Sequence, residues 1–460
     1  MRHARPVTPA HGYETCLLGP GAVVYVRRGR TRSMSDSDAP DTPEPPAEPG
    51  SVEPAALAEA LTAGEPVRLL DVRDRDEVDQ WRIEGAGVTF TQIPYAKFMA
   101  AQVRDEVDEL AAEVGGEGAV TVVCGQGEAS DYVAGVLSAA GVEARNLAGG
   151  MDAWGRVHLA RVVREDPIVV QYERPATGCL SYAVVDGGEA LLVDPLLAGV
   201  EAYREDLTER GARVVAAFDT HLHADHLSGL RELTPDRSGA GFPGNAGDPP
   251  RRLLPAGIDR REVTYGGETL GDGDTVDVGE TTVEAVALPG HTTEMTGLVV
   301  GDVLLAGDSL FLDSVARPDL QEGVDPRDQA AQLYETLHER LPAVGDDPLV
   351  APGHRRPETA LESGTYTARL SALRERVEAL GLERAAFVER VLTDTPRPAN
   401  VEQILALNRG AETLGAGSDA EDGDGGDGED GDGGDGEDGD GGEHAEEWVE
   451  LELGPNNCAV

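Results

Sequence analysis

The chain has 460 residues, with 38 Lys and Arg against 86 Asp and Glu and a formal net charge of −48. It has no apolar run of the roughly 18 residues that a membrane-spanning helix needs, and its mean field repels the phosphates of nucleic acids and anionic lipids. These features argue against membranes and nucleic acids as partners. The acidic excess and the single lysine, Lys97, predict a halophilic protein; the alternative is an ordinary acidic protein from a GC-rich genome.

The two ends of the chain differ from its centre. Residues 1–33 are basic, and the sequence turns acidic and proline-rich at Met34. This predicts a disordered or wrongly assigned segment over 1–50 with the true start at Met34, and a targeting arm is the alternative. Residues 411–460 hold 18 acidic residues and no Lys or Arg, which predicts an acidic Gly/Asp-rich disordered tail. Four scattered cysteines without a CxxC pair predict a cytoplasmic location.

The first predicted domain, 51–160, alternates strand-like and helix-like segments. Apolar runs at 67–72 and 119–123 alternate with helical patterns at 101–113 and 131–140, which predicts a parallel sheet with helices on its faces. Cys124 follows the second run, at the strand end where such sheets bind ligands. It begins a glycine-rich loop before a helix, and the amide groups there would stabilise a thiolate or a bound anion.

This region resembles rhodanese domains in the segments 69–73, 84–86, 93–94 and 147–154. The resemblance implies that Cys124 is catalytic and carries a persulfide between a sulfur donor and an acceptor. Ala129 stands where many rhodaneses place an arginine, and Glu128 adds negative charge, so the loop binds anions more weakly. Two alternatives therefore stay open: an active sulfur carrier, or a non-catalytic docking module.

In the second predicted domain, 165–410, metal-ligating side chains follow four strand-like runs. The runs are 214–218, 283–288, 303–306 and 349–351, and the side chains that follow them are His221, His223, Asp225, His226, His291, Asp308 and His354. Strands that end in ligands place them along one rim of a sheet structure. Imidazole and carboxylate together suit Zn, Fe or Mn, so the pattern predicts a metal site.

The pattern resembles the metallo-β-lactamase superfamily, an αββα sandwich, and within it persulfide dioxygenases more than glyoxalase II. The finer resemblance is carried by the segments 175–182, 191–195, 307–311, 316–320, 396–400 and 407–410. It implies one mononuclear Fe(II) per chain, held by His221, His291 and Asp308, that oxidises a low-molecular-weight thiol persulfide with O₂ to sulfite. The expected fold class is α/β, a rhodanese-like parallel sheet followed by the sandwich.

The sequence leaves two roles open at this site. The remaining ligand candidates either surround a mononuclear iron or complete a two-zinc site of the glyoxalase II kind, which would hydrolyse thioesters; they are His223, Asp225, His226 and His354. Arg317 is expected to bind a substrate carboxylate, with an ion pair to Asp319 as the alternative. Arg355 and Arg356 stand where glutathione-using relatives often have Asp and Tyr, which favours another thiol. The sequence is also compatible with an oligomer.

Overall fold

The computed structural model describes residues 49–234, 249–361, 363–392, 397–398, 400–412, 451–452 and 458. It also describes the backbone of two antiparallel strands, β1 (Tyr13–Leu18) and β2 (Ala22–Arg27), in a unit of the first 44 residues. Disorder is expected over 1–50, but the chain forms this pair there, because valine and tyrosine favour strands. The start at Met34 and the tail over 413–450 lie outside the described residues. All that follows concerns the second compact unit, Pro45–Val460.

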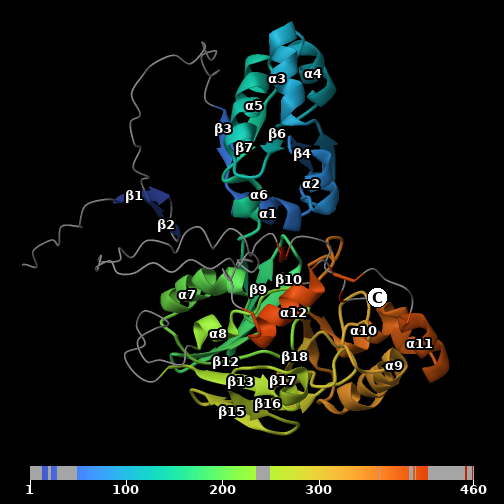
Figure 1. Ribbon diagram of the computed structural model, residues 1–460. Helices are drawn as coiled ribbons and strands as arrows, with labels where there is room; N and C mark the ends of the chain where they lie inside the picture. The colour runs from blue at the N-terminus through green and yellow to red at the C-terminus, as the bar shows by residue number, and fades with distance from the viewer. Residues whose placement is uncertain are drawn as a thin grey trace, which may run out of the picture. The chain divides into compact units, whose positions relative to one another are not determined.

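The first domain is a five-stranded parallel sheet with the order β3-β7-β6-β4-β5 (Figure 1). Its strands are β3 (Gly50–Val52), β4 (Val67–Asp71), β5 (Val88–Gln92), β6 (Val120–Val123) and β7 (Ala144–Leu147). Its helices are α1 (Pro54–Thr62), α2 (Arg75–Gln80), α3 (Tyr95–Arg104), α4 (Val107–Val114), α5 (Glu128–Ala139) and α6 (Gly150–Trp154). Leu69 and Leu70, successive residues of β4, belong to two different apolar clusters. Both faces of the sheet are therefore buried, as in other parallel sheets, and the predicted α/β class is confirmed.

One predicted helix of this domain is in fact two. The pattern at 101–113 predicts a continuous helix, but α3 ends at Arg104 and α4 begins at Val107. Asp105 between them has a left-handed φ of 59°. Aspartate tolerates this conformation better than most residues, so the chain can turn there.

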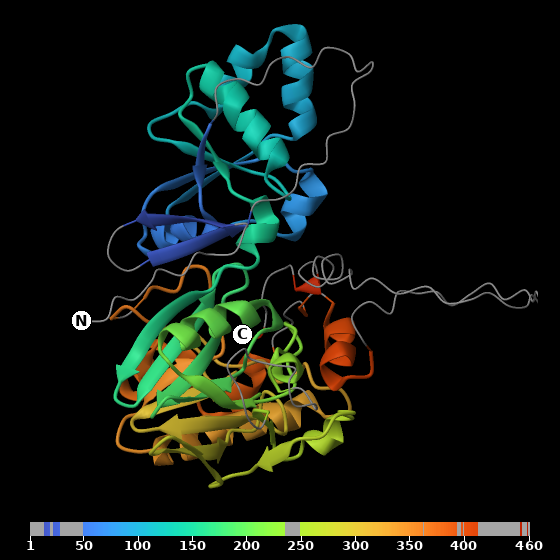
Figure 2. The same cartoon turned by 90° about the vertical axis from the view of Figure 1, so that its left-hand side faces the viewer.

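The second domain contains two mixed sheets that share one apolar core (Figure 2). The seven-stranded sheet, in spatial order, contains β14 (Glu268–Leu270), β13 (Arg251–Pro255), β12 (Arg213–Phe218), β11 (Glu189–Val193), β10 (Cys179–Asp186), β9 (Ile168–Arg174) and β8 (Leu159–Glu165). The six-stranded sheet contains β15 (Thr275–Val278), β16 (Thr281–Ala287), β17 (Thr296–Val300), β18 (Val303–Gly307), β19 (Leu349–Pro352) and β20 (Ala368–Arg369). Both sheets supply fully buried Val, Leu and Ala to the core, as a composition low in aromatic residues predicts.

Helices pack on the outer faces of these two sheets, which completes the expected αββα sandwich. The helices α7 (Val200–Glu209) and α8 (Leu230–Leu233) contact β12 of the seven-stranded sheet. The helices α9 (Pro326–Glu335), α10 (Leu370–Arg376) and α11 (Arg384–Val391) lie over the six-stranded sheet (Figure 1). The last helix, α12 (Val401–Arg409), packs on Leu227.

The second domain begins earlier than its predicted start at residue 165. Strand β8, from Leu159 to Glu165, pairs antiparallel with β9 and so belongs to the seven-stranded sheet. The turn signal Asp166-Pro167 joins two strands of one hairpin. The domain boundary therefore lies within the range 51–160 that the sequence gives to the first domain.

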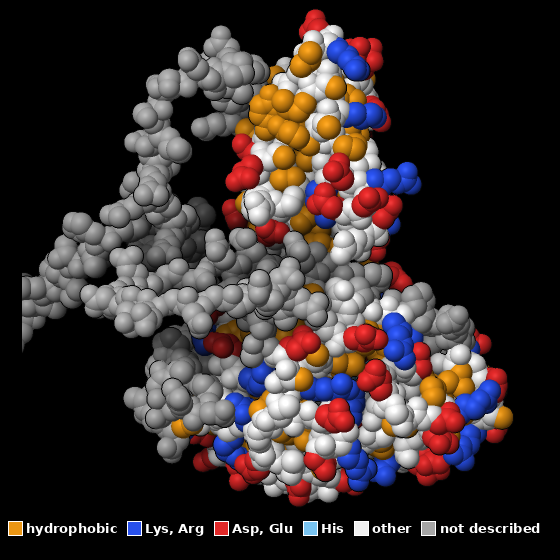
Figure 3. Space-filling view, in the orientation of Figure 1, with side chains coloured by type: hydrophobic (Ala, Val, Ile, Leu, Met, Phe, Trp, Pro, Cys, Tyr) orange, Lys and Arg blue, Asp and Glu red, His pale blue; other side chains and the backbone are white. Residues whose placement is uncertain are grey.

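The end of the chain also departs from expectation. A disordered tail is expected over 411–460, but Glu452 and Cys458 are 4% and 1% exposed and contact the second domain. Helix α12 ends at Arg409, just before that range. None of the described helices is long and apolar enough to cross a membrane. Acidic side chains are spread over the visible face with arginines among them, so the negative charge is not gathered in one patch there (Figure 3).

Candidate metal centre

The predicted ligands lie together where strands of both sheets end. Strand β12 of the seven-stranded sheet leads into the loop 219–226, which is buried throughout. The strands β16, β18 and β19 of the six-stranded sheet lead into His291, Asp308 and His354. Because the two sheets face each other across the core, their strand ends bring ligands from distant parts of the chain to one rim.

Three of these side chains form a compact donor set: His221, His291 and Asp308, whose ligand atoms lie within 4.8 Å of one another. Asp308 Oδ2 is 3.9 Å from His221 Nε2 and 3.8 Å from His291 Nε2. Two ligands that are each about 2.1 Å from a metal can be at most about 4.2 Å apart, so both distances suit a shared ion. Asp308 Oδ2 and His221 Nε2 are also buried without a hydrogen-bond partner. These orphaned atoms are what a metal would satisfy, so the residues fit the predicted metal.

Neighbouring groups fix the tautomers of the two histidines. His291 Nδ1 donates to the carbonyl of Arg317 at 2.8 Å, which leaves its Nε2 lone pair toward Asp308. The Thr220 hydroxyl donates to Asp194 at 2.9 Å and so accepts from His221 Nδ1 at 3.0 Å. Burial, followed by the charges of neighbouring histidines, holds the pKa of His221 well below its usual value, and burial also lowers the pKa of His291. Both rings are therefore neutral, the form that ligates metals.

His223 does not belong to this donor set. Its Nε2 lies 3.2 Å from Asp194 Oδ1 and 3.9 Å from Asp219 Oδ1, and these three residues form a separate group. The spacing of the motif cannot reveal this, because residues two apart in a loop can point in different directions.

A second donor set contains Cys179, Asp225, His226 and His354. His354 donates from Nδ1 to Asp308 at 2.7 Å and from Nε2 to Asp225 at 2.8 Å. Burial lowers the pKa of His354, but the carboxylates of Asp308 and Asp225 raise it well above its usual value. In this arrangement both ring nitrogens are engaged by carboxylates.

Cys179 was not predicted as a ligand. It begins β10 after Gly178, and its sulfur lies 3.8 Å from Asp225 Oδ2 and 3.9 Å from His226 Nδ1. Burial raises its pKa, but His354 and His226 lower it, to about 7. The only sequence signal was that Cys179 lies in a segment that resembles persulfide dioxygenases, because Asp225 and His226, which lie near its sulfur, are at least 46 residues away in the chain.

Asn408 holds the metal-binding loop in place from α12. Its amide nitrogen donates to the carbonyls of His223 and His226 at 2.9 and 2.8 Å, and its oxygen accepts from the Ser228 amide at 3.0 Å. Asn408 is 4% exposed and uses both donors and its acceptor on one loop. The late segment 407–410 therefore positions the site although it supplies no ligand.

Arg317 forms the ion pair with Asp319 that the sequence left open as the alternative to substrate binding. Its guanidinium binds Asp319 through Nε at 2.7 Å and Nη2 at 2.9 Å, and its side chain is 1% exposed. A guanidinium held in this way supports the loop beside His291 rather than reaching out for a substrate carboxylate. Arg355 likewise binds Glu173 through Nε at 2.7 Å.

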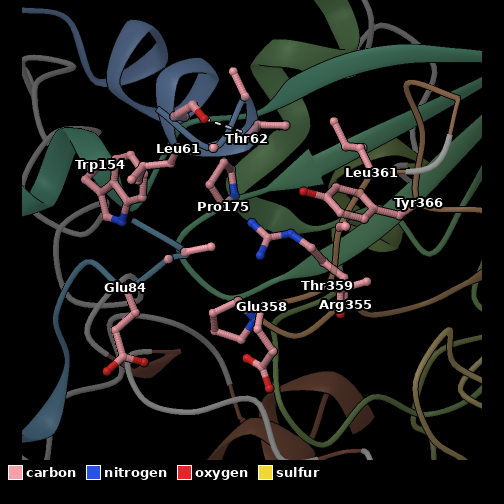
Figure 4. A pocket seen from close by; sticks show the side chains of 17 residues that line it. Leu61, Thr62, Glu84, Trp154, Pro175, Arg355, Glu358, Thr359, Leu361 and Tyr366 are labelled. Atoms are coloured by element: carbon pink, nitrogen blue, oxygen red, sulfur yellow. Dashed lines mark hydrogen bonds between the residues drawn. The ribbon is translucent and has the colours of Figure 1, made fainter. Parts of the chain in front are cut away.

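Arg355 also lines a pocket of about 290 Å³ (Figure 4). Pro175 and Tyr366 flank the guanidinium in this view, and Trp154 and Glu84 lie on the opposite side. The Arg355 guanidinium carbon is 5.1 Å from the centre of the Tyr366 ring. The pocket contains none of the metal-ligating residues, so it is distinct from the metal centre.

Cys124 is the predicted site residue of the first domain, and it follows β6 as expected. Its sulfur accepts from the Gly127 amide at 3.1 Å and from the Ser130 amide at 3.3 Å, with the Ser130 hydroxyl at 3.1 Å. These donors lie in the first turn of α5 and its preceding loop. These amide donors point at the sulfur, so the loop supplies part of the positive field that the missing arginine would have given.

The fold and the site together define a class of protein. A metal centre at the rim of an αββα sandwich is joined to a cysteine loop on a parallel α/β sheet. The model of the metallo-β-lactamase superfamily matches residues 174–354, and the rhodanese-like domain model matches residues 53–156. The chain belongs to the metallo-β-lactamase superfamily and carries an N-terminal rhodanese-like domain.

Two relatives represent different activities within this superfamily. The mitochondrial persulfide dioxygenase ETHE1 of Homo sapiens is 30% identical over 196 residues, which are 41% of this chain and 68% of that protein. The chain spans 59% of the corresponding Mus musculus protein. A hydroxyacylglutathione hydrolase of Methylococcus capsulatus is 34% identical over 213 residues, which are 45% of this chain and 75% of that protein.

Solved structures from the same superfamily also match. ETHE1 from Myxococcus xanthus has a TM-score of 0.43 and 24% identity, covering 55% of this chain and 99% of that one. A metallo-β-lactamase from Staphylococcus aureus has a TM-score of 0.45 and 22% identity, covering 52% of this chain and 72% of that one.

Proposed function

We propose that the second domain is an iron-dependent persulfide dioxygenase that catalyses RSSH + O₂ + H₂O → RSH + sulfite. The observation that supports it most is the separate set of two neutral histidines and one aspartate: His221, His291 and Asp308. Two His and one carboxylate on one face leave open positions for O₂ and substrate. Two zinc ions would need His223 as a further ligand, but its Nε2 lies in the separate group with Asp194 and Asp219.

The protein side of this mechanism follows from the contacts. Fe(II) bound to the three ligands would supply the oxygen chemistry and lower the pKa of the persulfide sulfur. His354 keeps its proton between two carboxylates and engages Asp308 Oδ1, which leaves Oδ2 toward the metal. Leu310 and Phe311, close to Asp308 in the chain, are buried, so apolar side chains there would help to exclude water.

The first domain is proposed to relay sulfane sulfur on Cys124. The loop donors described above stabilise the sulfur that carries it. A reducing, high-salt cytoplasm as the setting is a proposal from composition alone. The thiol that carries the substrate sulfur is proposed to be one other than glutathione.

A two-zinc thioester hydrolase is the second candidate function. It is favoured by the second donor set of Cys179, Asp225, His226 and His354 and by the 34% identity to a hydroxyacylglutathione hydrolase. In that reading His354 ligates the second metal.

The experiment that separates the two candidates is His354→Ala. The protein purified without air should hold about one iron per chain, consume O₂ only with a thiol persulfide, and release sulfite. His354→Ala should keep its iron and lose only part of the rate, about 10- to 100-fold, because His354 supports a ligand without being one. His338→Ala is the matched control, since His338 binds the carbonyls of Tyr334 and Leu380 away from the site. Two zinc ions per chain, loss of one in His354→Ala, and thioester cleavage without O₂ uptake would favour the hydrolase instead.

A further inference from the structure

The C-terminal end of the chain reaches the loop that carries metal ligands. One carboxylate oxygen of Glu452 accepts from the Leu227 amide at 2.6 Å, and the other forms an ion pair with Arg174. The side chains of Glu452 and Arg174 are both fully buried, and Leu227 directly follows His226 in the chain. A residue that composition places in an acidic tail therefore contacts the metal-binding loop.

Two side chains from the C-terminal part of the chain satisfy the backbone at the end of this loop. Asn408 donates to the carbonyls of His223 and His226. The next amide, that of Leu227, has Glu452 as its acceptor. Leu227 is 2% exposed, so water cannot take the place of the carboxylate, and a buried amide needs an acceptor. Glu452 therefore completes the hydrogen bonds that fix the loop.

The end of the loop is linked to the proposed iron set through His354. Asp225, two residues before Leu227, accepts from His354 Nε2 at 2.8 Å, and His354 Nδ1 donates to Asp308 at 2.7 Å. Asp308 belongs to the iron set. A displacement of the loop at Leu227 would therefore move Asp225 and, through His354, the carboxylate that is proposed to bind the metal.

The same end of the chain also contacts the other side of the metal centre. The backbone carbonyl of Cys458 accepts from the Arg317 amide at 3.1 Å, and the Arg317 carbonyl accepts from His291 Nδ1 at 2.8 Å. The Leu451 carbonyl accepts from the Asn400 side chain at 3.0 Å. The contacts of the chain end are thus not limited to the loop after β12.

The two oxygens of Glu452 have separable roles. Arg174 ends β9, and its Nε donates at 2.8 Å to the carbonyl of Gly155, directly after helix α6 of the first domain. The ion pair therefore fixes Glu452 near the junction of the two domains, and each buried charge needs the other because both have lost their water. The second oxygen, which binds the Leu227 amide, is the one that reaches the metal-binding loop.

We propose that Glu452 is a positioning residue of the metal centre. Its contact with the Leu227 amide fixes the loop in the geometry that binds the metal, and its ion pair with Arg174 holds the carboxylate in place for that contact. The proposal concerns how the centre is assembled, so it goes beyond the dioxygenase function and rests only on the presence of a metal there.

The test compares two charge-free pairs of substitutions in the full-length protein, with Co(II) as a coloured probe of the centre. Arg174→Gln with Glu452→Gln removes both charges but keeps an acceptor for the Leu227 amide, whereas Arg174→Gln with Glu452→Leu removes the acceptor as well. In a visible-absorption titration the first pair should bind Co(II) within about threefold of the wild type. The second should bind it at least about 10-fold more weakly and show a changed spectrum at saturation. Equal affinities in the two pairs would overturn the positioning role.

Two single substitutions complete the comparison. Arg174→Gln alone removes the counter-ion but leaves the contact with Leu227, so it should bind Co(II) within about threefold of the wild type. A loss of about 10-fold there would show that the ion pair controls the metal, and it would overturn the proposal even if the pair with Glu452→Leu failed to fold. Glu402→Leu is the matched control, because Glu402 is exposed on α12, and it should leave the titration unchanged.

Oxygen uptake distinguishes the failure of this proposal from the failure of the proposed function. At saturating iron, the pair with Glu452→Leu should show a kcat at least about 10-fold lower with a thiol persulfide and an unchanged KM, because Glu452 acts through the loop and not on the substrate. A raised KM at an unchanged kcat would contradict the positioning role. Wild-type protein that binds Co(II) but consumes no O₂ would overturn the dioxygenase function alone, and wild-type protein that binds no metal would overturn both.

Discussion

Gly353→Ala should disturb the metal centre without changing any ligand. A Cβ at this position would lie 2.4 Å from Asp308 Oδ1, where an ordinary contact needs at least 3.4 Å, so the carboxylate must retreat by about 1 Å. The alanine cannot move away easily, because its Cβ would also lie 3.2 Å from the Gly307 carbonyl carbon. The Gly353 amide and carbonyl are bound to Gly307 and Leu180 at 2.8 and 2.7 Å.

The expected cost has two parts. Overpacking a buried site costs about 1–3 kcal/mol in the free energy of unfolding. Moving a ligand by 1 Å can cost about 100-fold in rate, and here it also breaks the 2.7 Å contact between Asp308 and His354. Iron content, O₂ uptake with a thiol persulfide, and urea unfolding would measure both parts.

Gly381→Ala is the matched control for this change, because a Cβ there has no neighbour within 4 Å. It should keep iron and activity. If Gly353→Ala also kept its iron and worked within about twofold of the wild type, Asp308 would not be held at the position argued here.

Three further predictions concern other parts of the site. Asn408→Asp replaces two hydrogen-bond donors by an acceptor that faces the carbonyls of His223 and His226. It should lower the free energy of unfolding, measured in urea, by about 2–3 kcal/mol, and it should lower the iron occupancy. Unchanged occupancy would refute the positioning role of Asn408. Loading with Fe(II) at about 100 times its dissociation constant should stabilise the fold by about 2.7 kcal/mol and raise the Tm in a thermal scan by about 5–10 °C. The reason is that the metal would satisfy the buried, unpaired atoms of Asp308 and His221. His291→Ala should lose this shift. Cys124 should gain one sulfur atom from thiosulfate or a persulfide by mass spectrometry, and Ala129→Arg should speed the transfer by restoring a cation to the loop; the same gain in the tryptic peptide of Cys124→Ser would exclude this cysteine as the carrier.

Local sequence determined the two domain types and most of the candidate metal ligands. The strand runs before Cys124, His221, His291, Asp308 and His354 are all strands in the structure. This worked because a buried strand is a short apolar run, and a ligand must follow it directly to reach the rim of the sheet. The break at Asp105 was missed because one left-handed residue leaves the helical pattern on both sides intact.

Contacts between distant segments decided how the site is organised. The histidine motif treats His221 and His223 alike, but His223 turns toward Asp194, and only His221 joins the donor set with His291 and Asp308. Composition describes Cys458 as part of the end of an acidic tail. In the structure it is buried close to Asp308, which lies 150 residues earlier in the chain. Side-chain direction and long-range docking depend on packing across the two sheets, and no local pattern of residues contains that information.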